Sequence, residues 1–483
     1  MLYHSTRNDK ITVDSAQAVL SGLAEDGGLY VPQTLPAFDA RACLEKTTMD
    51  MAKMIIGALL PDIENMDTLV EKAYRGRFAT EELTPTVSAG DFSVLELFHG
   101  PTSAFKDVAL CMLPQLLTAA KKQKGVEEDI MILTATSGDT GKAALEGFHD
   151  VEGVKICVFY PDGGVSQVQR AQMVTQEGAN VGVCAVRGNF DDAQTGVKNI
   201  FGQAIAGKLP DSYRLSTANS INIGRLAPQI TYYFKAYADL MNSGKITFGD
   251  YVNFCVPTGN FGDILAGWLA KQLGLPVGKL ICASNANNVL TDFIATGTYD
   301  RRRPLHKTTS PSMDILVSSN LERLLYFLSG DTGLVAKLMQ QLNTQGFYTV
   351  PQALKDAISR EFACGCCGDE KAAETMEKVL RKTGYLCDPH TATAWAVAED
   401  YVNQTNDKNP MVVLSTASPY KFPAAVLEAL GQTPAADGFD QMEQLEQLSG
   451  VPVPQNLATL RGKAEKHTTV IDKTQMLRFV KEQ

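Results

Sequence analysis

Between residues 129 and 285, short apolar segments alternate with helical patterns, and this alternation constrains the fold more than any other feature of the sequence. The apolar segments are DIMILTATS, VKICVFYP, ANVGVCAVRG, YRLSTANS, YVNFCVPTG and KLICASN. They are rich in β-branched residues and nearly all apolar, which is typical of parallel strands covered on both faces. Because parallel strands need helical crossovers, the pattern predicts an α/β fold built on a mostly parallel sheet.

The rest of the chain divides into segments with different patterns. The periodicity of residues 14–24 predicts a helix whose N-cap is Asp14 or Ser15. Consecutive helical patterns over residues 319–384 predict a helical insertion, and residues 411–418 return to a strand. The expected organisation is an N-terminal subdomain of residues 1–92, a catalytic region of residues 93–432 with a smaller lobe over 93–215 and a larger lobe over 216–432, and a peripheral C-terminal segment of residues 433–483.

Charge and hydropathy exclude several kinds of partner. The 483 residues carry a formal net charge of -10, which disfavours nucleic acid and anionic membranes but allows a small anionic substrate in a locally positive pocket. The sequence has no apolar run long enough to span a bilayer, and its start, MLYHSTRNDK, does not resemble a secretory signal. We expect a cytoplasmic protein that acts on a small molecule and is a monomer or a homodimer.

The ten cysteines indicate a reducing compartment. Most of them lie singly in apolar segments, as small buried hydrophobic residues do. The exception is CGCCGD, residues 364–369, which lacks the paired C-x-x-C units or added histidines of a metal site. No metal is expected, and this stretch is predicted to be a loop between two helices.

Segments that follow strands are candidates for binding, because ligands of doubly wound sheets bind at the carboxyl ends of the strands. TATSGDTGKAAL, residues 134–145, places small hydroxyl residues and two glycines between a strand and a helix. Free backbone N–H groups at such a helix N-terminus suit a phosphate or a carboxylate. The alternative is an N-cap turn formed by Ser137 or Asp139 without a ligand. The residues alone leave both interpretations open.

Three further segments follow strands. PTGNFGDILAG, residues 257–267, resembles a phosphate cradle but lacks both the G-K-[ST] ending of a P-loop and G-x-G-x-x-G. This favours a single small phosphate group over a nucleotide, with a plain tight turn as the alternative. STANSINIGR, residues 216–225, adds Arg225, which either grips a phosphate by its planar fork or is solvated. LSTASPY, residues 414–420, gives a weak signal, because hydroxyl residues at strand ends are often N-caps.

FHGPTSAFKD, residues 98–107, places Lys106 between a Gly-Pro turn and a helix that looks buried. A lysine amine is a nucleophile only when neutral, and a dry pocket lowers its pKa. Lysine with an aldehyde cofactor gives a Schiff base, which stabilises carbanions at the α-carbon of an amino acid. Such a cofactor carries one phosphate and its substrate is anionic, so Lys106 with several anion loops fits this chemistry better than a capping lysine does. Asp107 is expected to point away from the site at the helix start, where the helix dipole favours it.

These residues also carry a family resemblance. HGPTSAFKD and TSGDTGKAAL together resemble signatures of the threonine synthases, which are fold-type II pyridoxal-phosphate (PLP) enzymes. The similarity, to their longer bacterial and fungal branch, runs from YHSTRND to LSTASPYKFP. It implies PLP as cofactor and a tryptophan synthase β-like α/β fold, with two lobes, an N-terminal subdomain and a helical insertion. The sequence departs from the family's pattern at one point: STASPYKFP has Ser418 and Tyr420 where the family has His-Pro-Ala, as in AHPAKF.

The resemblance implies a role for each matching residue. Lys106 resembles the Schiff-base lysine and the acid–base group that moves protons. The other cofactor-binding residues that it implies are Asp139 beside the phenolic oxygen, Thr258, Gly259, Asn260, Phe261, Gly262 and Asp263 around the phosphate, and Thr416 at the pyridine nitrogen. The substrate-binding residues that it implies are Thr136, Ser137 and Thr140 for the carboxylate, and Asn219, Ser220, Arg225 and Asn260 for the phosphate.

The reaction implied by the resemblance converts O-phospho-L-homoserine and water into L-threonine and phosphate, by elimination of the γ-phosphate and addition of water at the β-carbon. The same scaffold supports β-replacement and the dehydration of serine or threonine, because fold alone does not fix the reaction. A second phosphate grip around Arg225 favours the synthase, since a neutral hydroxy-amino acid needs none. A non-catalytic binding protein is the third alternative, and the retention of Lys106 with all the loops argues against it.

Overall fold

The computed structural model describes residues 1–205 and 213–483 and contains two main sheets, the larger of which has six strands. Its strand order is β14-β11-β10-β15-β5-β4, in which β4 and β5 pair antiparallel and the other neighbours pair in parallel. Successive residues of β10, Phe254 and Cys255, enter hydrophobic clusters on opposite faces, which explains its continuous apolar sequence. The strands are β4 (Thr86–Ala89), β5 (Phe92–Glu96), β10 (Val252–Pro257), β11 (Val277–Ser284), β14 (Phe362–Cys366) and β15 (Met411–Ser415).

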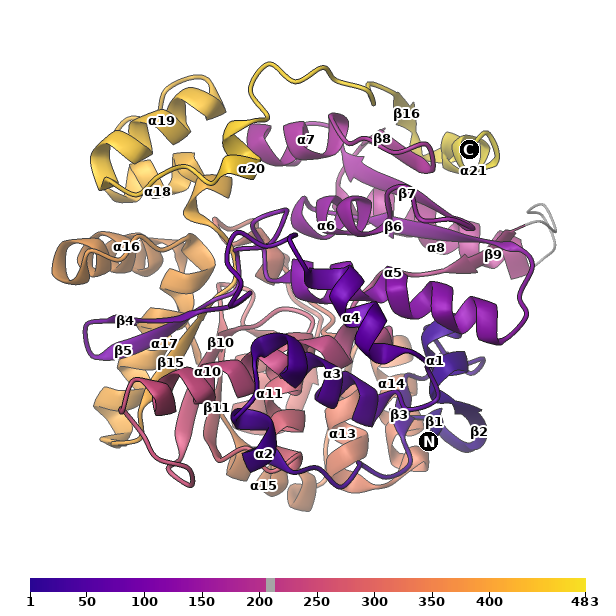
Figure 1. Cartoon of the computed structure of the whole chain (residues 1–483), viewed down its shortest axis with the longest axis horizontal. Coiled ribbons are helices and arrows are strands. Elements are labelled where there is room, and N and C mark those ends of the chain that lie inside the picture. Colours follow the sequence, from indigo (N-terminus) through magenta and orange to yellow (C-terminus); the bar gives the residue numbers. More distant parts are fainter. Residues whose placement is uncertain (206–212) are drawn as a thin grey trace.

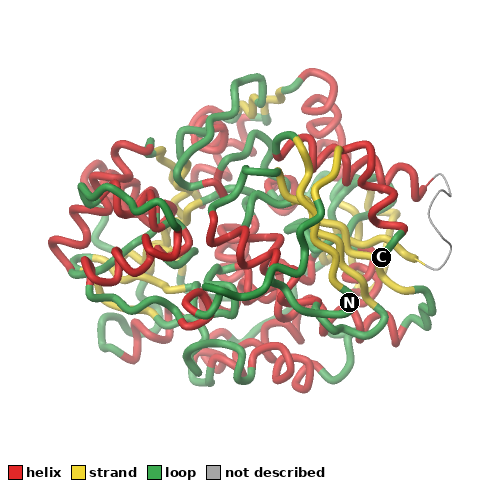
Figure 2. Tube along the Cα trace, turned by 90° about the horizontal axis from the view of Figure 1, so that it is seen from above, coloured by secondary structure: helices red, strands yellow, loops and turns green. Residues whose placement is uncertain are grey.

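The smaller sheet is parallel throughout, in the order β16-β8-β7-β6-β9. Its strands are β6 (Asp129–Ala135), β7 (Val154–Pro161), β8 (Val181–Arg187), β9 (Tyr213–Ser216) and β16 (Val470–Asp472). All six strands expected between residues 129 and 285 are present, with β6 to β9 in this sheet and β10 and β11 in the larger one. In Figure 2 helices and loops surround the strands.

Helices cover both faces of each sheet, as parallel strands require. The smaller sheet has α6 (Asp139–Phe148) on one face, and α8 (Phe190–Ile205) with α21 (Met476–Lys481) on the other. The larger sheet packs α17 (Pro389–Thr405) on one face, and α10 (Ile230–Asn242) and α11 (Gly262–Gln272) on the other. The long helix α5 (Lys106–Gln123) runs between the two lobes, against α6 (Figure 1).

The N-terminal region forms a small antiparallel sheet and four helices. Asp14 is the N-cap of α1, where its side chain accepts a hydrogen bond from the N–H of Gln17. This settles the choice between Asp14 and Ser15 and confirms the predicted helix. The elements are β1 (Leu2–Ser5), β2 (Asn8–Asp14), β3 (Tyr30–Pro32), α1 (Ser15–Ser21), α2 (Ala40–Leu44), α3 (Thr48–Leu59) and α4 (Met66–Tyr74).

The expected helical insertion is present, but it also contains strands. Residues 364–366 of the predicted loop form, with Phe362 and Ala363 before them, the strand β14 (Phe362–Cys366) at the edge of the larger sheet, parallel to β11. Glycine weakens strand patterns, yet it is required here, because a Cβ at Gly365 would lie 2.7 Å from Val397 in α17. The elements from the end of β11 to α16 are α12 (Val289–Thr296), β12 (Thr298–Asp300), α13 (Leu321–Ser329), α14 (Thr332–Gln345), β13 (Phe347–Thr349), α15 (Gln352–Glu361) and α16 (Asp369–Thr383).

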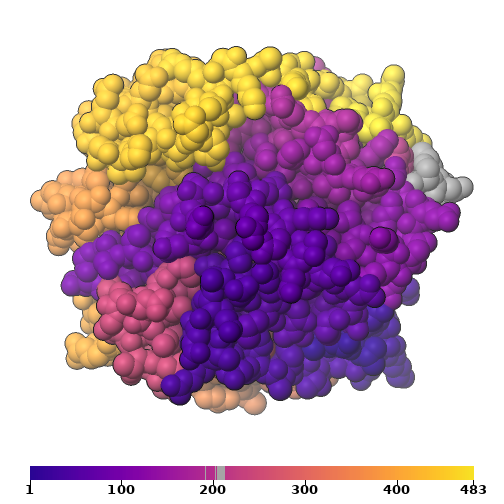
Figure 3. All heavy atoms as spheres, viewed as in Figure 1, coloured from indigo at the N-terminus to yellow at the C-terminus, as the bar shows by residue number. Residues whose placement is uncertain are grey.

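The C-terminal segment lies across the top of the molecule, where Figure 3 shows it in yellow. Its strand β16 pairs with β8, so this segment, expected to be peripheral, extends the smaller sheet. The expected lobe boundary at residue 93 also needs correction, because β5 joins the larger sheet. Residues 206–212 of the expected smaller lobe lie outside the described residues. The helices before β16 are α18 (Pro423–Ala429), α19 (Gly438–Ser449) and α20 (Gln455–Ala458).

Among residues 1–205 and 213–483, no helix combines the length and the apolar composition needed to cross a bilayer.

Candidate active site

A tight turn before α5 delivers Lys106 to the interior. The helix begins at Lys106 itself, and Ser103 in the turn has a left-handed φ of +59°. Asp107 closes the turn, because its carboxylate accepts hydrogen bonds from the N–H (2.9 Å) and the hydroxyl of Thr102. The carboxylate of Asp107 is thus directed at Thr102 and makes no ion pair with Lys106 among the described residues, as expected, although its side chain is buried in the turn, where a Cβ at Gly100 would lie 2.4 Å from it. Burial raises the pKa of Asp107 to about 6.

Two segments distant in sequence hold this turn. At the end of β15, the carbonyl oxygen of Thr416 accepts a hydrogen bond from the N–H of Phe105 (2.8 Å). From α20, the side-chain amide of Asn456 donates to the carbonyl oxygen of Pro101 (2.8 Å) and to the hydroxyl of Ser103 (2.9 Å). The C-terminal segment thus fixes the position from which Lys106 enters the site.

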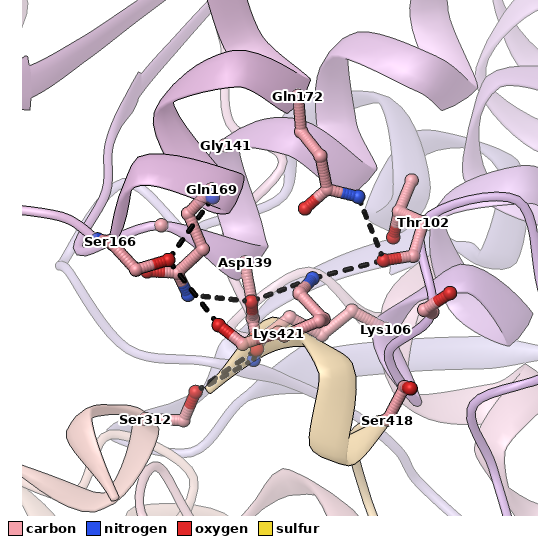
Figure 4. Close-up of polar contacts among 12 residues, drawn as sticks. Thr102, Lys106, Asp139, Gly141, Ser166, Gln169, Gln172, Ser312, Ser418 and Lys421 are labelled. Carbon is pink, nitrogen blue, oxygen red and sulfur yellow. Dashed lines mark hydrogen bonds and ion pairs between the residues drawn. The ribbon is translucent and has the colours of Figure 1, made fainter. Parts of the chain in front are cut away.

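The Lys106 amine is buried among polar and charged groups. Its Nζ lies 3.2 Å from the Oγ of Ser312 and 3.7 Å from Oδ2 of Asp139 (Figure 4). Burial lowers the pKa of Lys106 to about 8; the Asp139 carboxylate opposes this shift, and the charges of Lys421 and Arg225 reinforce it. A larger fraction of this amine is therefore neutral near neutral pH than in a solvated lysine, as a nucleophile requires.

Asp139 is a buried carboxylate at the N-terminus of α6. Its Oδ1 accepts hydrogen bonds from the Nζ of Lys421 (2.8 Å) and the Nε2 of Gln169 (2.9 Å), and its Oδ2 faces Lys106. Burial by itself raises the pKa of Asp139, but the ammonium groups of Lys421 and Lys106 outweigh burial and hold that pKa below its ordinary range. Asp139 is therefore ionised in this environment.

The loop between β6 and α6 is organised by Thr136. Its Oγ1 accepts hydrogen bonds from the N–H groups of Gly138 (3.0 Å) and Gly141 (2.8 Å). Ser137 on the same loop and Thr140 in the first turn of α6 are both half-buried. The structure therefore brings the three expected carboxylate-binding residues together, with the Thr136 hydroxyl engaged in shaping the loop.

The loop between β10 and α11 has the compact backbone expected of a phosphate cradle. Phe261 takes a left-handed φ of +61°, and α11 begins at the next residue, Gly262. A Cβ at Gly259 would lie 2.6 Å from the carbonyl oxygen of Ser312, so the close approach of these two backbones requires glycine. The N–H groups at the start of α11 give the loop the polarity that binds anions.

Two members of the expected cradle have side chains engaged elsewhere. The hydroxyl of Thr258 donates to the carbonyl oxygen of Val256 (2.7 Å). The Oδ1 of Asp263 accepts hydrogen bonds from Tyr232 (2.7 Å) and Tyr233 (2.9 Å), which ties α11 to α10, and burial raises the pKa of Asp263 to about 6. Asp263 thus holds the start of α11, which follows the loop, against α10.

Arg225, in the short helix α9 (Ile223–Leu226), is a buried cation without a hydrogen-bonded carboxylate among the described residues. Its side chain is 3 % exposed, and one guanidinium nitrogen donates to the carbonyl oxygen of Ala218 (2.8 Å). Its Nε has no hydrogen-bond partner in the described part of the chain. Burial lowers the pKa of Arg225 to about 10. Such a group is satisfied by an anion from outside the chain, and a phosphate matches its planar fork.

The segment that precedes α9, which contains Asn219 and Ser220, and the loop between β10 and α11 meet at Ser319. Its hydroxyl lies 3.4 Å from the Oγ of Ser220 and 3.4 Å from the Oδ1 of Asn260. Asn219, in the same segment, is exposed. The expected phosphate-binding residues therefore belong to adjoining loops, as a shared binding region requires.

Comparison with known proteins fits this geometry. The family model described as pyridoxal-phosphate dependent enzyme matches residues 81–417, and the models for the threonine synthase N terminus and C-terminal region match residues 2–74 and 391–480. Threonine synthase of Pseudomonas aeruginosa is 40% identical over 481 residues, which cover 97% of this chain and 98% of the relative. The chain belongs to the threonine synthase family.

Other members of the threonine synthase family extend the comparison to solved structures. PLP-bound threonine synthase from Brucella melitensis superposes with a TM-score of 0.87 at 38% identity, covering 100% of this chain and 99% of that one. The yeast threonine synthase structure gives a TM-score of 0.88 at 34% identity, covering 100% and 97%. Human threonine synthase-like 1 is 39% identical over 434 residues, or 86% of this chain, and the chain spans 58% of that relative's length. The fold-type II architecture and the use of PLP are those of the threonine synthase family.

Several residues at this candidate site were not identified from the sequence. They belong to segments far from Lys106 in the chain, and no local motif marks them as functional. Gln169 has the clearest local signal, because it forms a capping box with Ser166 at the start of α7 (Gln167–Val174), but that signal indicates a helix start and not a site. The missed residues are Gln169, Ser312, Lys421 and Asn456.

Proposed function

We propose that this protein converts O-phospho-L-homoserine and water into L-threonine and phosphate, with PLP held at Lys106. The observation that carries the proposal is the buried Lys106 amine, with a pKa lowered to about 8, in a chain that also buries the arginine Arg225 without a carboxylate hydrogen-bonded to it among the described residues. Bound PLP supplies an electron sink for negative charge that develops on the carbon atoms of an attached amino acid.

Lys106 is the proton-transfer group in this proposal. Its neutral Nζ takes the proton that leaves the α-carbon of the substrate and returns it at the end of the reaction. The Ser312 hydroxyl, 3.2 Å from that amine, orients it. The turn held by Thr416 and Asn456 keeps the amine within the site.

The surrounding loops divide the remaining binding among themselves. Arg225 binds the phosphate of the substrate, because its Nε has no partner among the described residues and its buried charge needs an anion. A neutral serine or threonine substrate leaves this cation unpaired, which favours the synthase over a dehydratase. The other assignments are Thr258, Gly259, Asn260, Phe261, Gly262 and Asp263 for the cofactor phosphate, Thr416 for the pyridine nitrogen, Asp139 for the phenolic oxygen, Thr136, Ser137 and Thr140 for the substrate carboxylate, and Asn219, Ser220 and Asn260 beside Arg225.

The test is to supply the purified protein and PLP with O-phospho-L-homoserine, L-serine or L-threonine in parallel. We expect equal amounts of phosphate and L-threonine from the first substrate and slow or no turnover of the other two. Release of keto acid from serine or threonine at a greater rate would identify a dehydratase instead. Absence of all three reactions, with PLP bound, would identify a binding protein.

Location and assembly complete the proposal. We place the enzyme in the cytoplasm, and the net charge of -10 supports an enzyme without a nucleic-acid or anionic-membrane partner. We expect a monomer or a homodimer, which sedimentation of the purified chain measures directly.

A further inference from the structure

Lys421 is a second buried lysine at the site, and none of the roles described so far accounts for it. It lies in the 3-10 helix η3 (Pro419–Lys421), which follows β15, and its side chain is 0 % exposed. Its Nζ donates to Oδ1 of Asp139 (2.8 Å) and to the carbonyl oxygen of Thr102 (2.9 Å). Lys421 therefore contacts both the carboxylate beside Lys106 and the turn that ends at Lys106 (Figure 4).

The two lysines share one carboxylate unequally. Lys421 lies 2.8 Å from Asp139, within hydrogen-bond distance, whereas Lys106 lies 3.7 Å from it. Gln169 supplies a second hydrogen bond to the same Oδ1 that Lys421 binds. The strongest interactions of the Asp139 carboxylate are thus made with Lys421 and Gln169, and the Lys106 amine is left with a hydroxyl and a more distant charge.

A purely structural role explains this pair poorly. Taking two charges out of water costs free energy that a single buried ion pair often does not recover, so a buried pair is weak evidence for stability. Long lysines that only support a helix end usually keep the ammonium group in water, but Lys421 is fully enclosed. Its position beside a reactive amine is therefore the feature that needs explanation.

We propose that Lys421 is a positioning residue that keeps the Lys106 amine neutral, because it occupies the Asp139 carboxylate and places a fixed positive charge beside Lys106. A nearby cation is a known way to activate a lysine nucleophile. The role rests on the proposed assignment of Lys106 as the reactive amine. The charged groups that face Lys106 are Asp139 from α6, Lys421 from η3, Arg225 from α9 and Asp107 from α5.

The experiment measures the neutral fraction of Lys106 in the full-length protein before PLP is added. The protein is treated with acetic anhydride across a range of pH, and acetylation of Lys106 is quantified by peptide mass spectrometry. In the wild type we expect the midpoint near pH 8. In Lys421→Met we expect the midpoint to rise by about one pH unit, which makes acetylation at pH 7 about tenfold slower.

Three further variants separate the effects of the two charges on the Lys106 midpoint. Asp139→Asn removes the charge that attracts a proton to Lys106 and retains Lys421, so the midpoint falls below that of the wild type. The double variant Asp139→Asn/Lys421→Met removes one charge of each sign, so its midpoint lies between those of the single variants. Lys421→Arg keeps the charge and stays closer to the wild type than Lys421→Met does.

Lys235→Met is the matched control. Lys235 is also buried, at 7 % exposed, and it pairs with Asp239 and Glu82 outside the site. We expect Lys235→Met to lower the melting temperature and to leave the Lys106 midpoint unchanged. A role of Lys421 in stability alone would make Lys421→Met behave in the same way.

The proposal is overturned if Lys421→Met folds and its Lys106 midpoint stays at or falls below the wild-type value. If Lys421→Met does not fold, Asp139→Asn decides, because an unchanged or higher midpoint in that variant contradicts the proposal. The measurement needs neither PLP nor substrate. A protein that shows these shifts but forms no threonine would therefore contradict the proposed function and leave the role of Lys421 standing.

Discussion

The site has two regions with buried positive charge, the lysine end around Lys106 and the arginine end around Arg225, and the two differ in the partners of that charge. At the lysine end, Lys106 and Lys421 share the carboxylate of Asp139, so the chain supplies its own counter-charge. At the arginine end, Arg225 is equally buried but donates to a carbonyl oxygen, and its Nε has no partner among the described residues. Burial is therefore similar at both ends, and the partners differ.

This difference separates chemistry from recognition. Lys106 shares the Asp139 carboxylate with Lys421, and its amine is partly neutral. Such an amine can take up and release a proton, as a group that catalyses proton transfer must do. A guanidinium remains charged even when buried and can only bind. The lysine end is thus suited to the reaction, and the arginine end is suited to holding an anion that arrives with the substrate.

The largest expected effect comes from removing the amine itself. Lys106→Ala should abolish covalent attachment of PLP and slow threonine formation by at least about 100-fold, because general acid–base catalysis commonly contributes about 10²–10⁴. Borohydride reduction followed by peptide mass spectrometry measures the attachment. Lys235→Met should retain both properties. If a PLP adduct forms on another lysine in Lys106→Ala, Lys106 is not the residue that binds PLP covalently.

The next effect concerns the stability of the lysine end. The pKa of Lys106 falls from 10.5 to about 8 on folding, so the folded chain binds fewer protons between these pH values and stability rises with pH across that window. Below pH 8 the protonated amine destabilises the fold. Lys106→Met should therefore be more stable than the wild type at pH 7 by about 2–3 kcal/mol, and the difference should vanish near pH 10.5. Urea unfolding at several pH values measures it, and a constant difference would contradict the expectation.

Removing the guanidinium at the arginine end should affect binding more than chemistry. Arg225→Ala should raise the KM for phosphohomoserine at least about tenfold, since charge-assisted hydrogen bonds contribute about 1.5–3 kcal/mol. The affinity for PLP, measured by fluorescence titration in the same variant, should change less. Equal losses of both would mean that the two phosphate sites are assigned the wrong way round.

The smallest expected effect comes from the support of the lysine turn. Asn456→Ala removes the side-chain hydrogen bonds to the carbonyl oxygen of Pro101 and the hydroxyl of Ser103. At about 1 kcal/mol for a hydrogen bond, we expect kcat to fall about fivefold with little change in KM. Asn456→Asp, which keeps one acceptor for Ser103, should lie between the wild type and Asn456→Ala. A change confined to melting temperature would show that the turn holds Lys106 without this residue.

Much of the fold follows from local sequence patterns, because parallel strands buried on both faces are apolar throughout. The strands β6 to β11 and the helix at residues 14–24 were predicted on this basis and are confirmed. Strand β14 was missed, because its cysteines and glycine do not form a strand-like pattern and its stability depends on β11 and α17. Strand β16 was missed because it has only three residues and pairs with a distant strand.

The residues of the candidate site also divide into those that local sequence patterns indicate and those that depend on contacts distant in the chain. Lys106 and the loops after β6, β10 and β15 were predictable, because topology places the carboxyl ends of parallel strands together. Lys421, Ser312 and Asn456 were not, since each acts through a partner far away in the chain. The burial of Asp107 was not predicted, because a helix-start carboxylate normally stays in water and the return contact to Thr102 depends on the turn.

The pairing of β16 with β8 has a consequence for the kinetics of folding. Val470 pairs with Ala185, so the edge of the smaller sheet closes through a contact between residues very far apart in the chain. Contacts of this kind form slowly, because a long loop must be ordered before they stabilise anything. Until they form, β8 presents an unpaired edge that can join another chain. We therefore expect refolding at high protein concentration to lose material to aggregation during the phase in which the C-terminal segment docks.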